Sequence, residues 1–250
     1  HYPLRRQRQM CIRDRTKVTM LKNMNIMGAL ALVGLILGLN SCQSFISSEE
    51  KLSHYRNYDR PAQLPKNPRA VHVKVSLSRQ MVYVMEGDRP LLITPATVGA
   101  AKTATPQGEF RVATKEKHKR ANSHGWAYKG NAARRVSSDR IPAGWNFIGT
   151  PMPYWVEFRN HYGFHMGWVK PYAASHGCIR LHENIAPKFF QLVSLGTPIS
   201  IQQKLPEDET WGKDIQPAPD ATPLPDYAPS MYIGDGYFRQ HAPVVMNPAH

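Results

Sequence analysis

Cysteine is scarce in this chain, and its placement excludes a disulfide framework. Three cysteines occur among 250 residues, Cys11, Cys42 and Cys178, and each lies in a different region of the sequence. A paired C-x2-C, a zinc-finger spacing, an aromatic RNA-binding motif and a recognisable helix-turn-helix are also lacking. The net charge of +14 therefore does not predict nucleic acid as a partner. It favours a solvated basic surface, or attraction to an anionic cell-wall polymer or lipid.

Long apolar runs are lacking as well. The run from Ile26 to Leu39 carries no charge, but it is too short for a typical membrane-spanning helix. With Lys22 before it, the run is typical of a secretory signal over residues 20–41. It ends in LNSC, which resembles the lipobox of bacterial lipoproteins and predicts lipidation of Cys42. Ordinary cleavage and an uncleaved anchor are the alternatives, and each implies export.

Three stretches lack the periodicity of a folded domain. Residues 1–19 begin without methionine and contain QMCIRDR, which resembles translated adapter sequence. They are interpreted as a non-native extension before a start at Met20 or Met24, with a genuine basic extension as the alternative. Residues 42–69 are polar and end in a proline-rich run, which predicts a tether. Residues 204–250 are rich in proline, and we expect a disordered or loosely packed tail there.

Residues 70–203 carry the pattern of a mainly β domain. Val71, Val73 and Val75 alternate with polar residues, which is typical of a half-buried strand. Further strands are predicted at the runs QMVYVM, LLITPATV, EFRVATK, WNFIGT and YWVEF, with Pro151-Met152-Pro153 separating the last two. The fold class that follows is mainly β with one or more helices.

Two segments of this domain are not expected to be strands. Residues 116–144 are basic and aperiodic, which predicts a long surface loop of the kind that often carries function. After Leu181, the order Asn184, Pro187 and Gly196 predicts a helix with an N-cap, a proline in its first turn and a glycine at its end. The run PISI then returns as a strand.

The stretch Tyr162–Leu181, YGFHMGWVKPYAASHGCIRL, gathers the residues that carry chemistry. Cys178, His165 and His176 are the parts of either an activated thiolate or a zinc site. A thiolate needs a base, donors for an oxyanion and small neighbours, and SHGCIR with an upstream histidine offers each. The zinc alternative would draw on Cys178, His165, His176, His161 and His182. It lacks the second cysteine that a structural zinc site usually shows.

These residues also carry a resemblance to a known family. GFHMG followed by SHGCIRL resembles the signature of the L,D-transpeptidase catalytic domain, of the YkuD type. The likeness runs from about Ala70 to Ile201 and includes LSRQ, TPQGEF and GTPISI in that order. It implies a mixed β-sandwich with a helix against it. It also implies a cysteine acyltransferase that acts on peptidoglycan stem peptides without a metal or cofactor.

The resemblance implies a role for each residue of the site. Cys178 would be the nucleophile, and His165 would be the base that later returns the proton. His176 and Gly177 would support the loop and the oxyanion. Ser175 and Arg180 would hold the loop or bind the carboxylate of the substrate, although the arginine could instead form a salt bridge that fixes its strand. Tyr154 and Trp168 would line the substrate cleft, with packing in the core or at its rim as the alternative.

The spacing departs from the family in one respect. Nine residues separate His165 from Ser175, whereas many members have a longer insertion. His161, with thirteen residues between, fits that spacing better. We choose His165 as the base because the run GFHMG matches the family's local context. Met166 stands where some relatives have a polar residue, so we expect a backbone carbonyl to orient His165.

Together these features predict a peptidoglycan L,D-transpeptidase in the bacterial cell envelope, exported, anchored to a membrane through Cys42 and monomeric. An L,D-carboxypeptidase, or an enzyme that attaches a protein to the wall, would use the same nucleophile with a different acceptor. From other classes, a non-catalytic wall-binding domain and a zinc-binding domain are the alternatives.

Overall fold

Two mixed sheets of five strands form the framework in this computed structural model, which describes residues 47–224 and 227–239. The first sheet has the order β3-β2-β1-β10-β4. Its strands are β1 (Val71–Ser76), β2 (Met81–Glu86), β3 (Arg89–Pro95), β4 (Gly108–Arg111) and β10 (Pro198–Gln202). All neighbours are antiparallel except β1 and β10, which run parallel with Val73 opposite Ile199.

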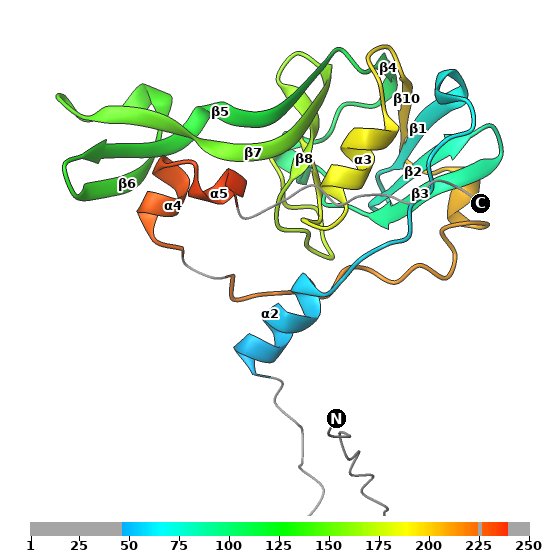
Figure 1. Cartoon of the computed structure of the whole chain (residues 1–250), viewed down its shortest axis with the longest axis horizontal. Helices are drawn as coiled ribbons and strands as arrows, with labels where there is room; N and C mark the ends of the chain where they lie inside the picture. Colours follow the sequence, from blue (N-terminus) through cyan, green and yellow to red (C-terminus); the bar gives the residue numbers. More distant parts are fainter. Residues whose placement is uncertain (1–46, 225–226, 240–250) are drawn as a thin grey trace, which may run out of the picture. The chain divides into compact units, whose positions relative to one another are not determined.

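The second sheet has the order β6-β5-β7-β8-β9 and ends with a parallel pair. Its strands are β5 (Thr114–Lys129), β6 (Ala132–Ser137), β7 (Asn146–Arg159), β8 (Tyr162–Met166) and β9 (Ile179–Leu181). In Figure 1, β5, β6 and β7 run out to one side, away from the first sheet. The parallel pair β8 and β9 brings the two halves of the chemical stretch next to each other.

Short helices fill the connections and cover the sheets. The α-helices are α2 (Ser48–Arg56), α3 (Ala186–Leu192), α4 (Pro229–Ile233) and α5 (Gly236–Arg239). The 3-10 turns are η1 (Pro68–Ala70), η2 (Ala101–Thr103), η3 (Ser138–Arg140) and η4 (Pro206–Asp208). Pro187 stands in the first turn of α3 as predicted, but the residue at the N-cap position is Ile185 rather than Asn184.

One apolar cluster joins buried side chains from both sheets and α3. It includes Val75 and Ile199 of the first sheet, Phe164 and Ile179 of the second, and Phe189 of the helix. The rings of Phe164 and Phe189 lie 4.6 Å apart, which ties α3 to the strand that carries His165. The predicted fold class, mainly β with one or more helices in a mixed sandwich, is confirmed.

The segment 116–144 is mostly strand, so the prediction of a long surface loop is wrong. It belongs to β5, β6 and the start of the connection to β7. β5 and β6 form a hairpin in which His124 faces Ser137 and Lys129 faces Ala132. Both faces of much of this hairpin are open to solvent, so its strands carry charged residues at consecutive positions and show no apolar alternation.

The runs WNFIGT and YWVEF form one strand, β7, and not the two that the prolines between them predict. Pro151 pairs with Arg120 of β5, and Pro153 pairs with His118. On its other side, β7 pairs with β8 only from Val156 onward. A missing N–H is therefore tolerated where the strand has a partner on one side only.

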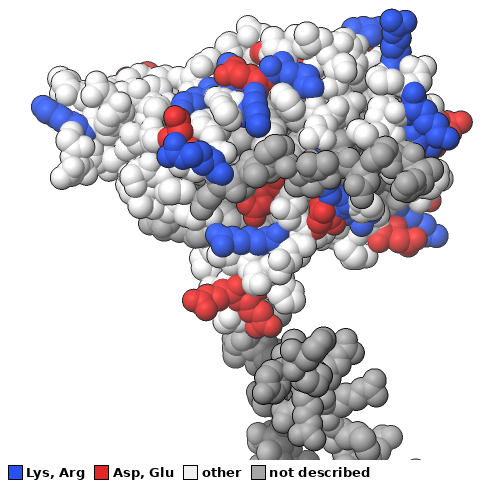
Figure 2. All heavy atoms as spheres, in the orientation of Figure 1, with Lys and Arg blue, Asp and Glu red and all other residues white. Residues whose placement is uncertain are grey.

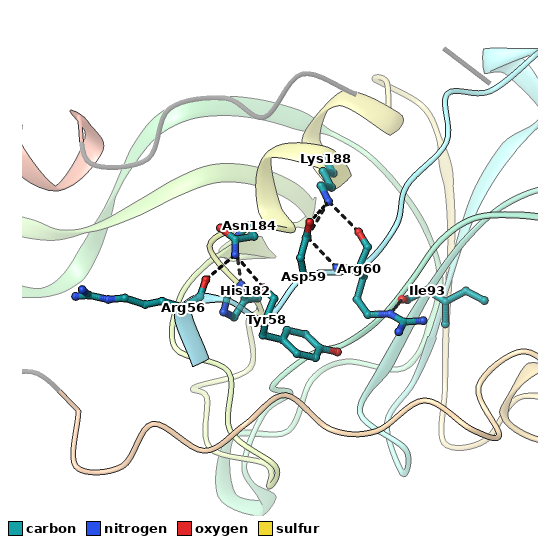
Figure 3. Close-up of polar contacts among 8 residues, drawn as sticks. All are labelled: Arg56, Tyr58, Asp59, Arg60, Ile93, His182, Asn184 and Lys188. Carbon is teal, nitrogen blue, oxygen red and sulfur yellow. Dashed lines mark hydrogen bonds and ion pairs between the residues drawn. The ribbon is translucent and has the colours of Figure 1, made fainter. Parts of the chain in front are cut away.

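Part of the predicted tether is folded against the domain. Ser47 caps α2 by accepting a hydrogen bond from the amide of Glu50, and Tyr55 of this helix is 1% exposed. Figure 3 shows how the chain after α2 is held: Lys188 of α3 donates to Asp59 at 2.6 Å and to the carbonyl of Arg60 at 2.9 Å. Composition alone does not reveal these contacts, because the segment is polar overall.

The described part of the tail packs on the domain through specific contacts, where its composition predicts a disordered or loosely packed segment. Buried Asp208 accepts hydrogen bonds from Ser76 at 2.7 Å, from the hydroxyl of Tyr83 at 2.8 Å and from the amide of Leu205 at 3.0 Å. Leu205 covers the outer face of β2, and this explains why that strand is buried on both faces. Further along, Tyr232 of α4 stacks on Trp126 of β5.

The expected extension, signal sequence and lipidated Cys42 lie outside the described residues. Among the helices that are described, none has both the length and the apolar character needed to cross a membrane. Figure 2 shows Lys and Arg scattered over the visible face, with acidic side chains between them.

Candidate active site

The loop that carries Cys178 is held from within by a buried serine. Ser175 is 2% exposed; its hydroxyl donates to the carbonyl of Cys178 at 2.5 Å and accepts from the amide of Gly177 at 3.0 Å. Both contacts of this hydroxyl stay inside the loop, so Ser175 holds the loop, which is one of the two roles expected of it. The amide of Gly177 is likewise engaged, so the predicted oxyanion support does not come from it in this conformation.

A second set of bonds ties the same loop to the segment after β3. Thr103 donates to the carbonyl of Ser175 and Thr105 to the carbonyl of Gly177, each at 2.9 Å. Gly177 has a φ of +110°, and a Cβ there would lie 2.6 Å from the ring of Tyr162. The position therefore requires glycine both for its backbone angle and for space.

The thiol of Cys178 lies against the backbone at the start of β8. Its Sγ donates to the carbonyl oxygen of His161 at 3.7 Å. Burial raises the pKa of the Cys178 thiol, while a hydrogen bond from the backbone of Gly163 and the charge of Arg180 oppose the rise. The resting thiol is therefore protonated at neutral pH, and its activation requires a base.

His165 lies on β8 where that base is needed. The parallel register pairs His165 with Arg180 and Phe164 with Ile179, and its continuation places Gly163 opposite Cys178. Alternate residues of a strand face the same way, so His165 and Cys178 share one face of the sheet, two positions apart. The order of the motif and the strand pairing together bring them close.

The imidazole of His165 is buried and held in one tautomer. Its Nδ1 lies 2.8 Å from the carbonyl oxygen of Met166, which can only accept, so Nδ1 carries the proton and Nε2 carries the lone pair. This confirms that a backbone carbonyl orients His165. Burial lowers the pKa of His165 to about 4, and Arg180 adds to that effect. A neutral imidazole with a free lone pair can accept a proton at neutral pH.

His161, the other candidate base, occupies the turn between β7 and β8. It is exposed and has a φ of +66°, and its amide donates to Glu157 at 3.0 Å. Its backbone carbonyl contacts the thiol, and among the described residues neither its ring nor that of His165 forms a hydrogen bond with Cys178. His165 differs in that its imidazole is buried and held in one tautomer, with Nε2 unprotonated. The arrangement favours His165.

Arg180 presents a cation beside the imidazole. Its backbone pairs with Thr97 in both directions, at 2.9 and 3.0 Å. A Cβ on Gly167 would lie 3.2 Å from Cδ of Arg180 and 3.5 Å from Cε1 of His165, so glycine at that position leaves room for both side chains. Among residues 47–224 and 227–239, no carboxylate forms an ion pair with Arg180.

The two aromatic residues predicted to contact substrate take different places. Tyr154 is 4% exposed and packs edge-on against Phe190 at 5.7 Å, so it belongs to the core and not to the cleft. Trp168 lines a small cavity of about 10 Å³ beside the end of β8. The cavity's other walls are Tyr55, Met166, Gly167, Glu183, Tyr227 and Tyr237.

Tyr55 is a site residue that the sequence analysis missed. Its hydroxyl accepts from the amide of Val169 at 2.9 Å and lies 3.5 Å from the carbonyl of Gly167, so it fixes the chain that leaves His165. The backbone carbonyl of Tyr55 in turn lies 2.7 Å from Nε2 of buried His182. The sequence signal that could have predicted α2, the helix that carries Tyr55, is the capping pattern Ser47-Ser48-Glu49-Glu50.

The side chains named for the zinc alternative do not gather. His182 lies against Tyr55, and His176 is exposed with its ring stacked on that of His124. In the portion of the chain that the structure describes, no three His, Cys, Asp or Glu side chains are placed to hold a metal ion.

The comparison with known proteins agrees with this geometry. Residues 70–201, more than half of the chain, match the YkuD family, the L,D-transpeptidase catalytic domain. The chain belongs to this family. A search of curated proteins gave no match.

Similar folds occur among solved structures. An L,D-transpeptidase from Mycobacterium smegmatis is 22% identical, over 53% of this chain and 58% of that one, with a TM-score of 0.42. An L,D-transpeptidase (Yku) from Stackebrandtia nassauensis is 19% identical, over 68% and 73%, with a TM-score of 0.41. The match thus spans less than two thirds of the M. smegmatis protein.

Proposed function

We propose that this protein is a peptidoglycan L,D-transpeptidase, in which Cys178 forms a thioester with a stem peptide and passes it to an amine. The observation that carries the proposal is the shared face of Cys178 and His165, with the imidazole neutral and Nε2 unprotonated. Membership of the YkuD family supports it.

The first half-reaction makes the thioester. The resting S–H points to the carbonyl of His161, so the thiol must first rotate toward Nε2 of His165. The thiol proton moves to Nε2 as Sγ attacks the amide carbonyl between an L-centre and a D-centre. The tetrahedral intermediate collapses, the C–N bond breaks, and the imidazolium gives its proton to the departing D-amino acid.

The second half-reaction reverses these roles. The acceptor amine attacks the thioester carbonyl and gives its proton to Nε2 of His165. The C–S bond then breaks, and the thiolate of Cys178 takes the proton back. Burial and the charge of Arg180 keep the imidazole neutral between the two steps, and the carbonyl of Met166 keeps it oriented.

Two neighbours of the nucleophile complete the proposal. The amide of Cys178, with the exposed His176, is placed to stabilise the oxyanion, since the amide of Gly177 is engaged by Ser175. Arg180 is placed to bind a carboxylate of the stem peptide, because no ion pair within the described residues occupies it.

The test is thioester formation on the full protein. Incubation with a disaccharide-tetrapeptide or a carbapenem should add the mass of the acyl group, and Cys178→Ala should abolish the addition. His165→Gln should slow it by about a hundredfold or more, the usual contribution of a general base, while His161→Gln should not. A well-folded wild-type protein that stays unmodified, and instead binds equimolar zinc lost in Cys178→Ala, would refute the proposal.

The acceptor decides between transpeptidation and its relatives. Muropeptide analysis of cell wall incubated with the enzyme should show new cross-links joining two stem peptides. Release of a tripeptide with no cross-link would identify an L,D-carboxypeptidase, and a protein linked to the stem would identify a wall-attachment enzyme.

The proposal extends to where the enzyme works. The signal-like run and Cys42 support export and a lipid anchor in the bacterial cell envelope, with the domain monomeric and facing the wall. Labelled fatty acid should enter the wild-type protein in cells and should not enter Cys42→Ala, which should leave the membrane fraction. A label retained by Cys42→Ala would overturn the anchor.

A further inference from the structure

β5 of the second sheet contains a bulge, and this bulge contacts the nucleophile loop through His124 and His176. Arg120 pairs with Pro151 and Gly125 pairs with Gly149, so the four residues Ala121–His124 stand opposite Thr150 alone. Bulges of this kind redirect side chains out of a ladder and are common next to active sites. Asn122, Ser123 and His124 are exposed, and His124 is unpaired toward β7 but pairs with Ser137 of β6.

Two glycines make the bulge possible. A Cβ at Gly149 would lie 1.8 Å from the carbonyl oxygen of Ala121, and a Cβ at Gly125 would lie 2.1 Å from the carbonyl oxygen of Ile148. Backbone atoms cannot yield at such distances, so both positions exclude every other residue in this conformation. The bulge is therefore built into the sheet and is not a surface irregularity.

The tail braces the bulge at both ends. Before it, Arg120 donates to the carbonyls of Tyr232 at 2.8 Å and Gly234 at 2.9 Å. After it, Trp126 stacks on the ring of Tyr232, with centroids 5.4 Å apart. A short exposed segment held at both ends loses little further freedom when a ligand binds.

The last residue of the bulge meets the nucleophile loop. The ring of His124 stacks on that of His176 at 5.3 Å and 10°, and Nδ1 of His124 lies 2.9 Å from the hydroxyl of Ser123. His176 stands two residues before Cys178, so the stacked pair includes a residue of the nucleophile loop. Imidazole, hydroxyl and amide side chains all form hydrogen bonds with peptide groups.

We propose that the bulge Ala121–His124 is a binding surface for the stem peptide, with the stacked pair His124 and His176 contacting the backbone that flanks the scissile carbonyl. The inference rests on the proposed function. It adds a specificity-determining residue, His124, from a part of the chain that the nucleophile motif does not include.

Binding to an inactive protein tests the inference separately from catalysis. With the full chain carrying Cys178→Ala, calorimetry with disaccharide-tetrapeptide should show Kd about tenfold higher when His124→Ala is added, the loss expected for one peptide hydrogen bond. His124→Phe keeps a stacked ring without its hydrogen bonds and should lose the same factor. His54→Ala, on exposed α2, is the matched control and should leave Kd unchanged.

A second measurement separates contact with substrate from support of the loop. In proteins that retain Cys178, iodoacetamide should alkylate His124→Ala at the wild-type rate, because this small reagent needs no contact with the bulge. Unchanged Kd in His124→Ala, or full recovery in His124→Phe, would overturn the inference. An equal loss of alkylation would also overturn it. If wild type binds the peptide in this way but forms no thioester, the proposed function fails and the binding surface stands.

Discussion

The hydrogen bond between Nδ1 of His165 and the backbone carbonyl of Met166, at 2.8 Å, joins two neighbouring residues of one strand. A carboxylate in that place would stabilise the imidazolium. A carbonyl fixes the tautomer with much less effect on charge, and burial lowers the pKa of His165 to about 4. The resting site therefore holds a neutral imidazole and a protonated thiol.

The first prediction concerns stability and pH. An unfolded histidine protonates near 6.5, whereas His165 in the folded protein stays neutral down to about 4. Between these values the unfolded chain binds the extra proton, so the free energy of unfolding should fall as pH falls from 6.5 to 4. The full loss from this group should be about 3 kcal/mol.

Urea unfolding of wild type and His165→Gln across this pH range measures the effect. The variant lacks the titrating group, so this loss of stability should occur in wild type alone. The free energy of unfolding of wild type minus that of the variant should therefore become smaller as pH falls toward 4. A difference that stays constant from pH 7 to pH 4 would show that His165 titrates normally.

The second prediction concerns the thiol. Burial raises the pKa of Cys178, and Arg180 opposes the rise. Alkylation by iodoacetamide should therefore be slow at neutral pH, and its rate should keep rising with pH beyond the ordinary pKa of a thiol. Arg180→Gln removes the opposing charge and should shift the rate profile to still higher pH. Lys170→Gln, which changes a partly exposed cation outside the site, should leave the profile in place.

Much of the site is readable from the sequence because the information is local. Alternation identifies β1, and the strand β8 and loop 175–178 follow directly from GFHMG and SHGC. The parallel register of β8 and β9 does not follow from the sequence, because residues 167–178 connect the two strands and leave the register open. The oriented tautomer of His165 is predictable too, since no polar side chain follows it.

The parts that could not be predicted depend on contacts between distant segments. The hairpin β5–β6 is hidden because charged residues on both of its faces remove the alternation that reveals strands. Tyr55 and Asp208 lie in segments whose composition predicts flexibility, yet each is buried by residues more than a hundred positions away. Composition reports average polarity, whereas one buried aromatic or carboxylate is enough to anchor a segment.

The third prediction concerns the anchor of the tail. Asp208 accepts from Ser76, from the hydroxyl of Tyr83 and from the amide of Leu205. Asp208→Ala leaves these donors without their acceptor and should lower the free energy of unfolding by about 2–4 kcal/mol. Thermal unfolding followed by circular dichroism measures the change. Glu209→Ala, an exposed neighbour, is the control, and equal stability of the two variants would contradict the assignment.

The last prediction concerns Tyr55, whose hydroxyl lies between the carbonyl of Gly167 and the amide of Val169. Tyr55→Phe keeps the ring, which packs on Trp168 and His182, but it removes the acceptor for a buried amide. The loss should destabilise the fold by about 1–2 kcal/mol. Because the freed chain directly follows Met166, thioester formation should slow through kcat, with KM for the stem peptide little changed.

Mass spectrometry of samples quenched at successive times, at several peptide concentrations, separates kcat from KM. Tyr58→Phe is the matched control, since Tyr58 lies in the same segment and its buried hydroxyl has no hydrogen-bond partner within the described residues. A fall in stability with an unchanged kcat would show that α2 supports the fold alone. A selective fall in kcat would show that the segment between the predicted lipid anchor and the domain also holds the catalytic histidine in place.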